Sequence, residues 1–129
     1  MNRVNLLYIA YIANILILMA ICWNMFVGSG VASVFEGKVD ESTGLRLLVG
    51  SFWLAILVGS TAGLFAPRFF APIIVIQIFY KSLWLLVFVL PLVMAGKSDQ
   101  VPWGIATTFI VIALSYPILF GLSRAWQPV

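Results

Sequence analysis

The sequence contains no histidine and a single cysteine, Cys22, and only 9% of its residues are charged. Without histidine, the chain has no imidazole to bind haem, chlorophyll or zinc, and no histidine to act as a general base. One cysteine can form neither an internal disulfide nor a cluster of thiolate ligands. These shortages exclude much of metal-centred and acid–base chemistry.

Charge of both signs is scarce, with four acidic and seven basic residues, whereas 64% of the chain is hydrophobic. A soluble domain has about 25% charged and about 45–50% apolar residues. This chain has too few charges to cover a water-facing surface, so we predict an integral membrane protein. Its net charge of +3 is small and scattered, which argues against nucleic-acid binding. The four acidic residues fall in apparent loops and leave no paired carboxylates within the membrane for a proton relay.

Long hydrophobic runs are what the sequence has in abundance. A membrane-spanning helix needs about 20 mostly apolar residues, and four segments meet this requirement, namely residues 5–27, 45–66, 70–94 and 103–122. The connections between them are short, except for the stretch Gly28–Gly44. We therefore predict an all-α fold in which residues 1–129 form one transmembrane domain, an integral membrane bundle of four helices.

The first span has features of a signal peptide, since it follows Arg3 and precedes the small residues Gly30-Val31-Ala32. Its apolar stretch is longer than the roughly 7–15 residues of a signal-peptide core. We therefore predict that this segment is a retained helix.

Four spans place both termini on one side of the membrane, and the basic residues favour neither orientation by number. Three basic residues lie on the side of the termini, namely Arg3, Arg68 and Arg124. Three lie on the opposite side, namely Lys38, Arg46 and Lys97. The N-terminal amine breaks the tie, because positive charge is retained in the cytoplasm and acids count little. We predict cytoplasmic termini.

Three tryptophans, Trp23, Trp53 and Trp103, fall near the predicted outer ends of three helices. Indole rings prefer the headgroup zone, so we interpret these residues as an interfacial belt. An aromatic cage around a ligand is the alternative interpretation.

The second span carries a ladder of small residues four positions apart, namely Ser51, Ala55, Gly59 and Gly63. This spacing aligns them on one helix face and includes a G-x-x-x-G pair, which lets another helix approach closely. The ladder predicts close packing inside the bundle, with oligomerisation through the same face as the alternative.

Lys81 is the strongest candidate for a functional residue, because it lies near the middle of the third span. An unpaired ammonium at that depth costs several kcal/mol, and charged residues inside a membrane mark functional sites by default. Gln77 lies four residues before Lys81 and Trp84 three residues after it, so the three share one helix face.

Other spans supply polar side chains at matching depth. Asn14 lies level with Lys81, Tyr11 lies one turn closer to the cytoplasmic side on the same face as Asn14, and Tyr116 lies in the inner half of the fourth span. Polar side chains buried in a bilayer must find one another or water. We therefore expect a polar cluster of Asn14, Gln77, Lys81 and Tyr116, with Tyr11 as a further member.

Three interpretations of Lys81 remain open at the level of sequence. The side chain extends its ammonium to the nearer interface, or it binds a carboxylate or carbonyl of a partner subunit. In the third interpretation, it binds an anionic or quinone-like ligand in a cavity of the bundle. The sequence does not decide whether the amine is charged.

The second span begins as Gly44-Leu45-Arg46-Leu47-Leu48-Val49-Gly50 and ends as Gly63-Leu64-Phe65-Ala66-Pro67-Arg68. This pattern, after a long loop in a small four-helix protein, resembles the DoxX-like group of bacterial membrane proteins. The similarity covers about a quarter of the chain. Some members of the group resemble subunits of quinone-linked oxidoreductases, so the resemblance implies the fold, a bacterial inner membrane and proximity to quinone. It implies no catalytic residues.

These observations favour a non-catalytic accessory or structural subunit of a larger membrane complex, which packs through its small-residue and aromatic helix faces. One alternative is a small transporter or channel that works as an oligomer. Another is a subunit of a membrane oxidoreductase that binds quinone or lipid in a cavity near Lys81. The expected partners are membrane lipids together with other membrane subunits or further copies of the chain. No cofactor is required, although quinone or lipid is compatible with the sequence.

Overall fold

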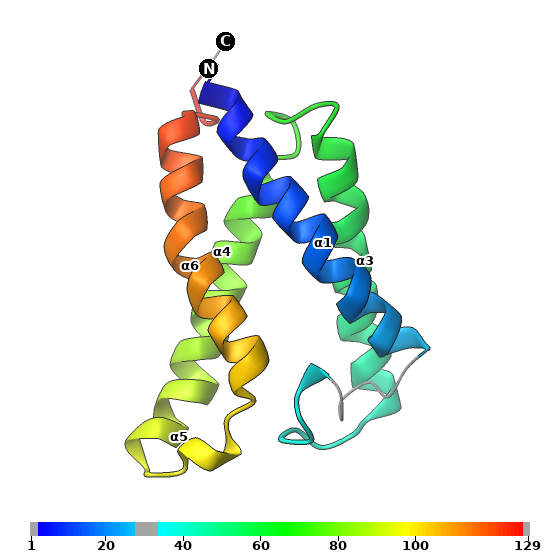
Figure 1. Cartoon of the computed structure of the whole chain (residues 1–129), viewed down its shortest axis with the longest axis vertical. Coiled ribbons are helices and arrows are strands. Elements are labelled where there is room, and N and C mark those ends of the chain that lie inside the picture. The colour runs from blue at the N-terminus through cyan, green and yellow to red at the C-terminus, as the bar shows by residue number, and fades with distance from the viewer. Residues whose placement is uncertain (1–2, 28–33, 128–129) are drawn as a thin grey trace.

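The computed structural model describes residues 3–27 and 34–127. Over these residues the chain is helical and contains no strand (Figure 1). The main elements are α1 (Leu6–Phe26), α3 (Thr43–Gly63), α4 (Pro72–Trp84), the π-helical turn η2 (Leu85–Val89), α5 (Leu90–Met94) and α6 (Trp103–Ser123). Short 3-10 turns, η1 (Arg3–Asn5) and η3 (Ser98–Gln100), precede α1 and α6. The segment Gly30–Ala32 lies outside the described residues, as does the first part of the Gly28–Gly44 connection.

Four helical segments of the described chain are long and apolar enough to span a membrane, namely Arg3–Phe26, Thr43–Gly63, Pro72–Met94 and Trp103–Ser123. The predictions of an all-helical fold and of four such helices are confirmed. The bounds differ by only a few residues from the predicted ones. The second helix begins earlier than predicted because Ser42 caps it, with its Oγ accepting a hydrogen bond from the Leu45 N–H at 3.5 Å.

The third segment continues through a π-helical turn. The Leu90 N–H donates to the carbonyl of Leu85, five residues earlier in the chain. Leu90 is the residue directly before Pro91. Proline lacks an N–H and its ring collides with the carbonyl four residues earlier. The wider π-helical turn directly before Pro91 changes the position of the preceding carbonyl groups relative to the proline ring. The helix therefore continues past Pro91 as α5.

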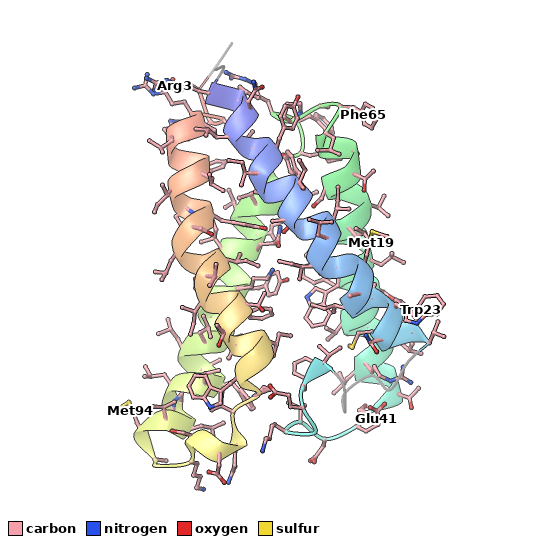
Figure 2. The ribbon with its side chains drawn as sticks, viewed as in Figure 1. Arg3, Met19, Trp23, Glu41, Phe65 and Met94 are labelled. Carbon is pink, nitrogen blue, oxygen red and sulfur yellow. The ribbon has the colours of Figure 1, made fainter. Side chains whose placement is uncertain are left out.

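The helices pack as two antiparallel pairs, α1 with α3 and α4 with α6, and α1 also packs against α6. Contact between α3 and α4 is sparse. Figure 1 shows that α1 begins and α6 ends at one end of the bundle, here called the termini end, and that the two pairs separate toward the opposite end, the loop end. In Figure 2, Arg3 and Phe65 lie at the termini end, and Trp23, Glu41 and Met94 lie toward the loop end.

The buried apolar residues form one cluster at the termini end and others toward the loop end. The first cluster joins Leu7, Ala10, Tyr11, Ala71, Ile74, Ile112 and Tyr116. The largest cluster toward the loop end joins Leu18, Cys22, Met25, Trp53, Ile56, Ile105 and Phe109. The termini end is therefore closed by packed side chains, whereas the pockets described below lie between the helix pairs farther along.

The small-residue ladder of α3 does not form one packed face. Gly59 and Gly63 are buried, whereas Ser51 and Ala55 are exposed. A Cβ atom at Gly59 would meet the Ile73 side chain of α4, and one at Gly63 would meet the Tyr11 ring of α1. The packing predicted for all four residues thus holds for only two within the bundle, because the two glycines face different neighbours and the other two face outward.

Candidate functional site

Lys81 lies on α4 and is buried inside the bundle, with 3% of its surface exposed. Its Nζ donates a hydrogen bond of 2.9 Å to Oε1 of Gln77, one helical turn earlier. The same Nζ lies 5.4 Å from the centre of the Tyr80 ring and 5.0 Å from that of Phe109. The side chain is held at the bundle centre by these groups, so extension of the ammonium to a headgroup layer is not what the structure shows.

Gln77 is fully buried, and its Nε2 has no hydrogen-bond partner within the described residues. Within the described part of the chain, the one acceptor for the N–H groups of this pair is Gln77 Oε1, to which Lys81 donates. The ion pair found in the described residues joins Arg46 and Glu41, outside this site. Lys81 and Gln77 together therefore offer several buried N–H donors and lack an acceptor for them.

A second polar group joins three helices. Asn14 of α1 donates through Nδ2 to Ser60 Oγ of α3 at 2.9 Å. The Tyr116 hydroxyl of α6 lies 2.5 Å from Asn14 Oδ1 and 3.1 Å from the Ala10 carbonyl, both of which accept from it. Unlike Gln77 Nε2, each side-chain nitrogen and oxygen atom of this Asn14–Ser60–Tyr116 network has at least one hydrogen-bond partner among the described residues.

The two polar groups meet at a small internal cavity, called here the central cavity. Asn14 and Lys81 both line it, and its volume is about 10 Å³, room for about one water molecule. No hydrogen bond connects the two groups directly in the described residues. The expected cluster of Asn14, Gln77, Lys81 and Tyr116 is thus present as two hydrogen-bonded groups that share one cavity, with Ser60 as an added member.

Tyr11 and Trp84 lie apart from both polar groups. The Tyr11 hydroxyl donates to the Pro67 carbonyl at 2.6 Å, so this residue ties α1 to the turn between α3 and α4. Trp84 stacks on Phe88 and packs edge-on against Phe109, with both pairs of ring centres 5.2 Å apart. Tyr11 and Trp84 were predicted to belong to the site because of their depth in the membrane and their position on the helix face. In the structure neither of them forms a hydrogen bond with Lys81 or Asn14.

A pocket of about 210 Å³ lies beside the central cavity and is called here the aromatic chamber. Six of its seven lining residues are aromatic: it is lined by Phe35, Val49, Phe52, Trp53, Tyr80, Trp84 and Phe109. Trp53 and Phe109 line both the chamber and the central cavity. The chamber therefore adjoins the Lys81 site through two shared side chains.

Trp53 corrects the interpretation of the tryptophans as an interfacial belt. It is 3% exposed, and its Nε1 donates to the Tyr80 hydroxyl at 3.0 Å. Trp23 and Trp103 are exposed, as an interfacial position requires. The aromatic residues next to Lys81 on α4 are visible in the sequence. Phe35 and Phe109 are far from Lys81 in the chain, and no sequence pattern predicts that they line the same chamber.

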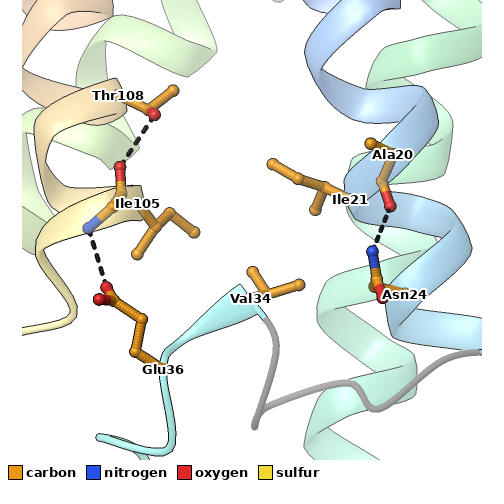
Figure 3. Close-up of a pocket in the computed structure, with 8 residues that line it drawn as sticks. Ala20, Ile21, Asn24, Val34, Glu36, Ile105 and Thr108 are labelled. Carbon is orange, nitrogen blue, oxygen red and sulfur yellow. Dashed lines mark hydrogen bonds between the residues drawn. The ribbon is translucent and has the colours of Figure 1, made fainter.

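A third pocket, of about 270 Å³, lies between α1 and α6 toward the loop end (Figure 3). Glu36 Oε2 accepts a hydrogen bond of 2.8 Å from the Gly104 N–H, in the first turn of α6. Ile21 and Thr108 line both this pocket and the central cavity. The central cavity thus adjoins the pocket between α1 and α6 and the aromatic chamber, and both lie away from the termini end.

Chemically, the site is suited to binding. It contributes an amine, two carboxamides and two hydroxyl groups, and the described residues hold no group of three or more His, Cys, Asp or Glu that could bind a metal ion. Comparisons with protein-family models, curated proteins and solved structures find no match. The resemblance to the DoxX-like group stays a prediction.

Proposed function

We propose that the chain is a non-catalytic protein of a bacterial inner membrane, with cytoplasmic termini, whose bundle binds a membrane-soluble molecule through an oxygen acceptor. A lipid carboxylate and a quinone carbonyl both carry such an oxygen. The four apolar helices support the membrane location, since each is long enough to cross a bilayer. The accessory role in a larger complex is compatible with this proposal.

The observation that carries the proposal is the excess of donors at Lys81 and Gln77. A buried donor without a partner costs about 1–3 kcal/mol, and more where the group is charged. Among the described residues, Gln77 Nε2 has no hydrogen-bond partner and the Lys81 amine has one acceptor, Gln77 Oε1, for its N–H groups. An oxygen brought by a ligand removes this cost, which gives the site its affinity.

The burial of Lys81 favours a small ligand over a partner subunit as the source of that oxygen. With 3% of its surface exposed, Lys81 can be reached by a partner's carboxylate only if the partner enters the bundle. A small molecule needs only the aromatic chamber or the pocket between α1 and α6, which adjoin the central cavity. The partner-subunit interpretation therefore ranks second.

Replacing Lys81 by methionine tests the proposal, because methionine keeps the apolar stem and removes the donors. With purified protein in lipid nanodiscs, we expect oleate, menadione or both to bind the unchanged protein, and Lys81→Met to weaken that binding about tenfold or more. Lys97→Met, at an exposed lysine of the loop end, is the matched control. Circular dichroism on heating checks that both variants stay folded.

Two results would contradict the proposed function. The first is that neither oleate nor menadione binds the unchanged protein. The second is equal affinity in Lys81→Met and in the unchanged protein. If Lys81→Met instead changes only the mass of an assembly purified in mild detergent, a partner subunit supplies the oxygen.

The proposed orientation makes a separate prediction. In a Cys22→Ser background, we expect single cysteines at Lys38 and Asp99 to react with an impermeant maleimide added outside intact cells. A cysteine at Arg124 should react only after the membrane is opened, because four spans put it on the cytoplasmic side. Labelling of positions 38 and 124 from the same side would refute the four-span topology.

A further inference from the structure

The aromatic chamber lies between α3 and α4, the two consecutive long helices that pack least closely on each other. Phe52 lines the chamber and is 42% exposed, so the chamber reaches the outside of the bundle at this side chain. If the chain spans a membrane, that side faces lipid. A molecule dissolved in the bilayer therefore reaches the chamber sideways, without passing through water.

The walls of the chamber are flat rings, of which Phe35 and Trp53 are stacked at 19° and three other pairs meet at steep angles. Phe52 meets Tyr80 at 71°, Tyr80 meets Phe109 at 87°, and Trp84 meets Phe109 at 69°. Edge-to-face walls of this kind present both ring faces and ring edges to the space between them. Such a space suits another flat ring, which stacks on one wall while its edge meets the next.

The surface that lines the chamber is almost entirely apolar, and its polar side-chain groups are the Trp53 N–H and the Tyr80 hydroxyl. The Tyr80 hydroxyl accepts from Trp53 Nε1 at 3.0 Å, and its own proton has no acceptor among the described residues. Lys81 Nζ lies 5.4 Å and 5.0 Å from the centres of the Tyr80 and Phe109 rings, which are two of the chamber walls. Lys81 lines the central cavity and not the chamber, so a ring in the chamber that carries an oxygen finds its donor in the Tyr80 hydroxyl.

We infer that the aromatic chamber binds the planar ring of a membrane-soluble molecule, with a carbonyl oxygen of that ring directed to the Tyr80 hydroxyl. This inference rests on the proposed function and narrows it, because it selects a flat ring over an acyl chain as the body of the ligand. Tyr80 is then a specificity-determining residue, because its hydroxyl can donate a hydrogen bond to a ring that carries an oxygen and not to a ring without one.

The test compares three probes in lipid nanodiscs. Menadione is a flat ring with carbonyl oxygens, 2-methylnaphthalene is a closely related ring without oxygen, and oleate is an acyl chain with a carboxylate. A Cys22→Ser background prevents reaction of menadione with the thiol. We expect the unchanged chamber to bind menadione at least about tenfold more tightly than 2-methylnaphthalene, the effect of a hydrogen bond of about 1.4 kcal/mol.

Two variants act on different parts of the chamber. Val49→Phe fills it from α3, and we expect menadione affinity to fall about tenfold, whereas Val58→Phe, at a residue of the same helix that is 63% exposed, leaves it unchanged. Tyr80→Phe keeps the ring and removes the hydroxyl. Tyr80→Phe should reduce the preference for menadione over 2-methylnaphthalene several-fold. Because both affinities are measured on the same variant, their ratio does not depend on the stability of that variant.

The outcomes separate this inference from the proposed function. Oleate binding that depends on Lys81, without menadione binding, overturns the inference and leaves the proposed function standing. Oleate that loses as much affinity as menadione in Val49→Phe shows that the chamber holds a chain, and also overturns the inference. A menadione preference that is unchanged in Tyr80→Phe removes Tyr80 from the recognition of the oxygen and contradicts the proposal as stated.

Discussion

Replacing Gly63 by leucine is expected to lower the free energy of unfolding by about 3 kcal/mol. A Cβ atom at this position would lie 2.7 Å from Cζ of Tyr11 and 2.8 Å from its two Cε atoms. The Tyr11 ring cannot easily move aside, because it is fully buried and its hydroxyl is bonded to the Pro67 carbonyl. Either α1 and α3 separate, or the Tyr11–Pro67 bond breaks. Unfolding of the purified protein by a denaturing detergent measures the loss.

Two other glycines provide matched controls for Gly63. A Cβ atom at Gly121 meets nothing within 4 Å, so Gly121→Ala should be neutral or should stabilise α6 by up to about 1 kcal/mol. At Gly59 the nearest atom is Cδ1 of Ile73, the end of a flexible side chain that can rotate away. We therefore expect Gly59→Ala to cost less than Gly63→Ala. Equal effects at positions 59, 63 and 121 would show that the Tyr11 contact is not a constraint on the bundle.

Asn14→Leu is expected to lower the free energy of unfolding by about 1–3 kcal/mol. Asn14 is the shared partner of Ser60 and Tyr116, and leucine of similar size removes both hydrogen bonds. Ser60 is fully buried, so its hydroxyl loses the amide that it accepts from. Tyr116 keeps the Ala10 carbonyl as an acceptor, which limits the loss.

A double-mutant cycle isolates the bond between Asn14 and Tyr116. With Asn14→Leu, Tyr116→Phe and the double variant, we expect a coupling energy of about 0.6 kcal/mol and at most about 1.7, the range of hydrogen bonds between membrane helices. Val111→Leu, at an exposed position of α6, controls for general effects of substitution. Strict additivity would mean that the two side chains do not cooperate in holding α1 to α6.

The four long helices could be predicted from the sequence because each signal is local. About 20 consecutive apolar residues identify a span wherever it lies in the fold, and Pro72 and Pro102 mark the starts of α4 and α6. Ser42 marks the start of α3 in the same way. None of these signals depends on which helix packs beside which.

The arrangement of the site depended on contacts between helices, which depth alone does not determine. Asn14 and Lys81 lie level and share a cavity, yet each bonds within its own group. Tyr11 lies one turn from Asn14 but finds a backbone carbonyl, that of Pro67, which no pattern of side chains could reveal. Trp53 looked interfacial by its position along the helix and is buried because α3 turns it toward Tyr80.

The Asn14–Tyr116 bond has a consequence for how the protein is made. Tyr116 follows Asn14 by 102 residues, so at about 5–20 residues per second the ribosome needs about 5–20 s to deliver it. Throughout that time the amide oxygen of Asn14 lacks the Tyr116 hydroxyl from which it accepts in the finished bundle, although α1 has already been synthesised. The first helix is therefore synthesised with an incomplete polar group, and only the arrival of α6 completes it. A chain that ends before α6 lacks the hydroxyl group that bonds to Asn14 Oδ1.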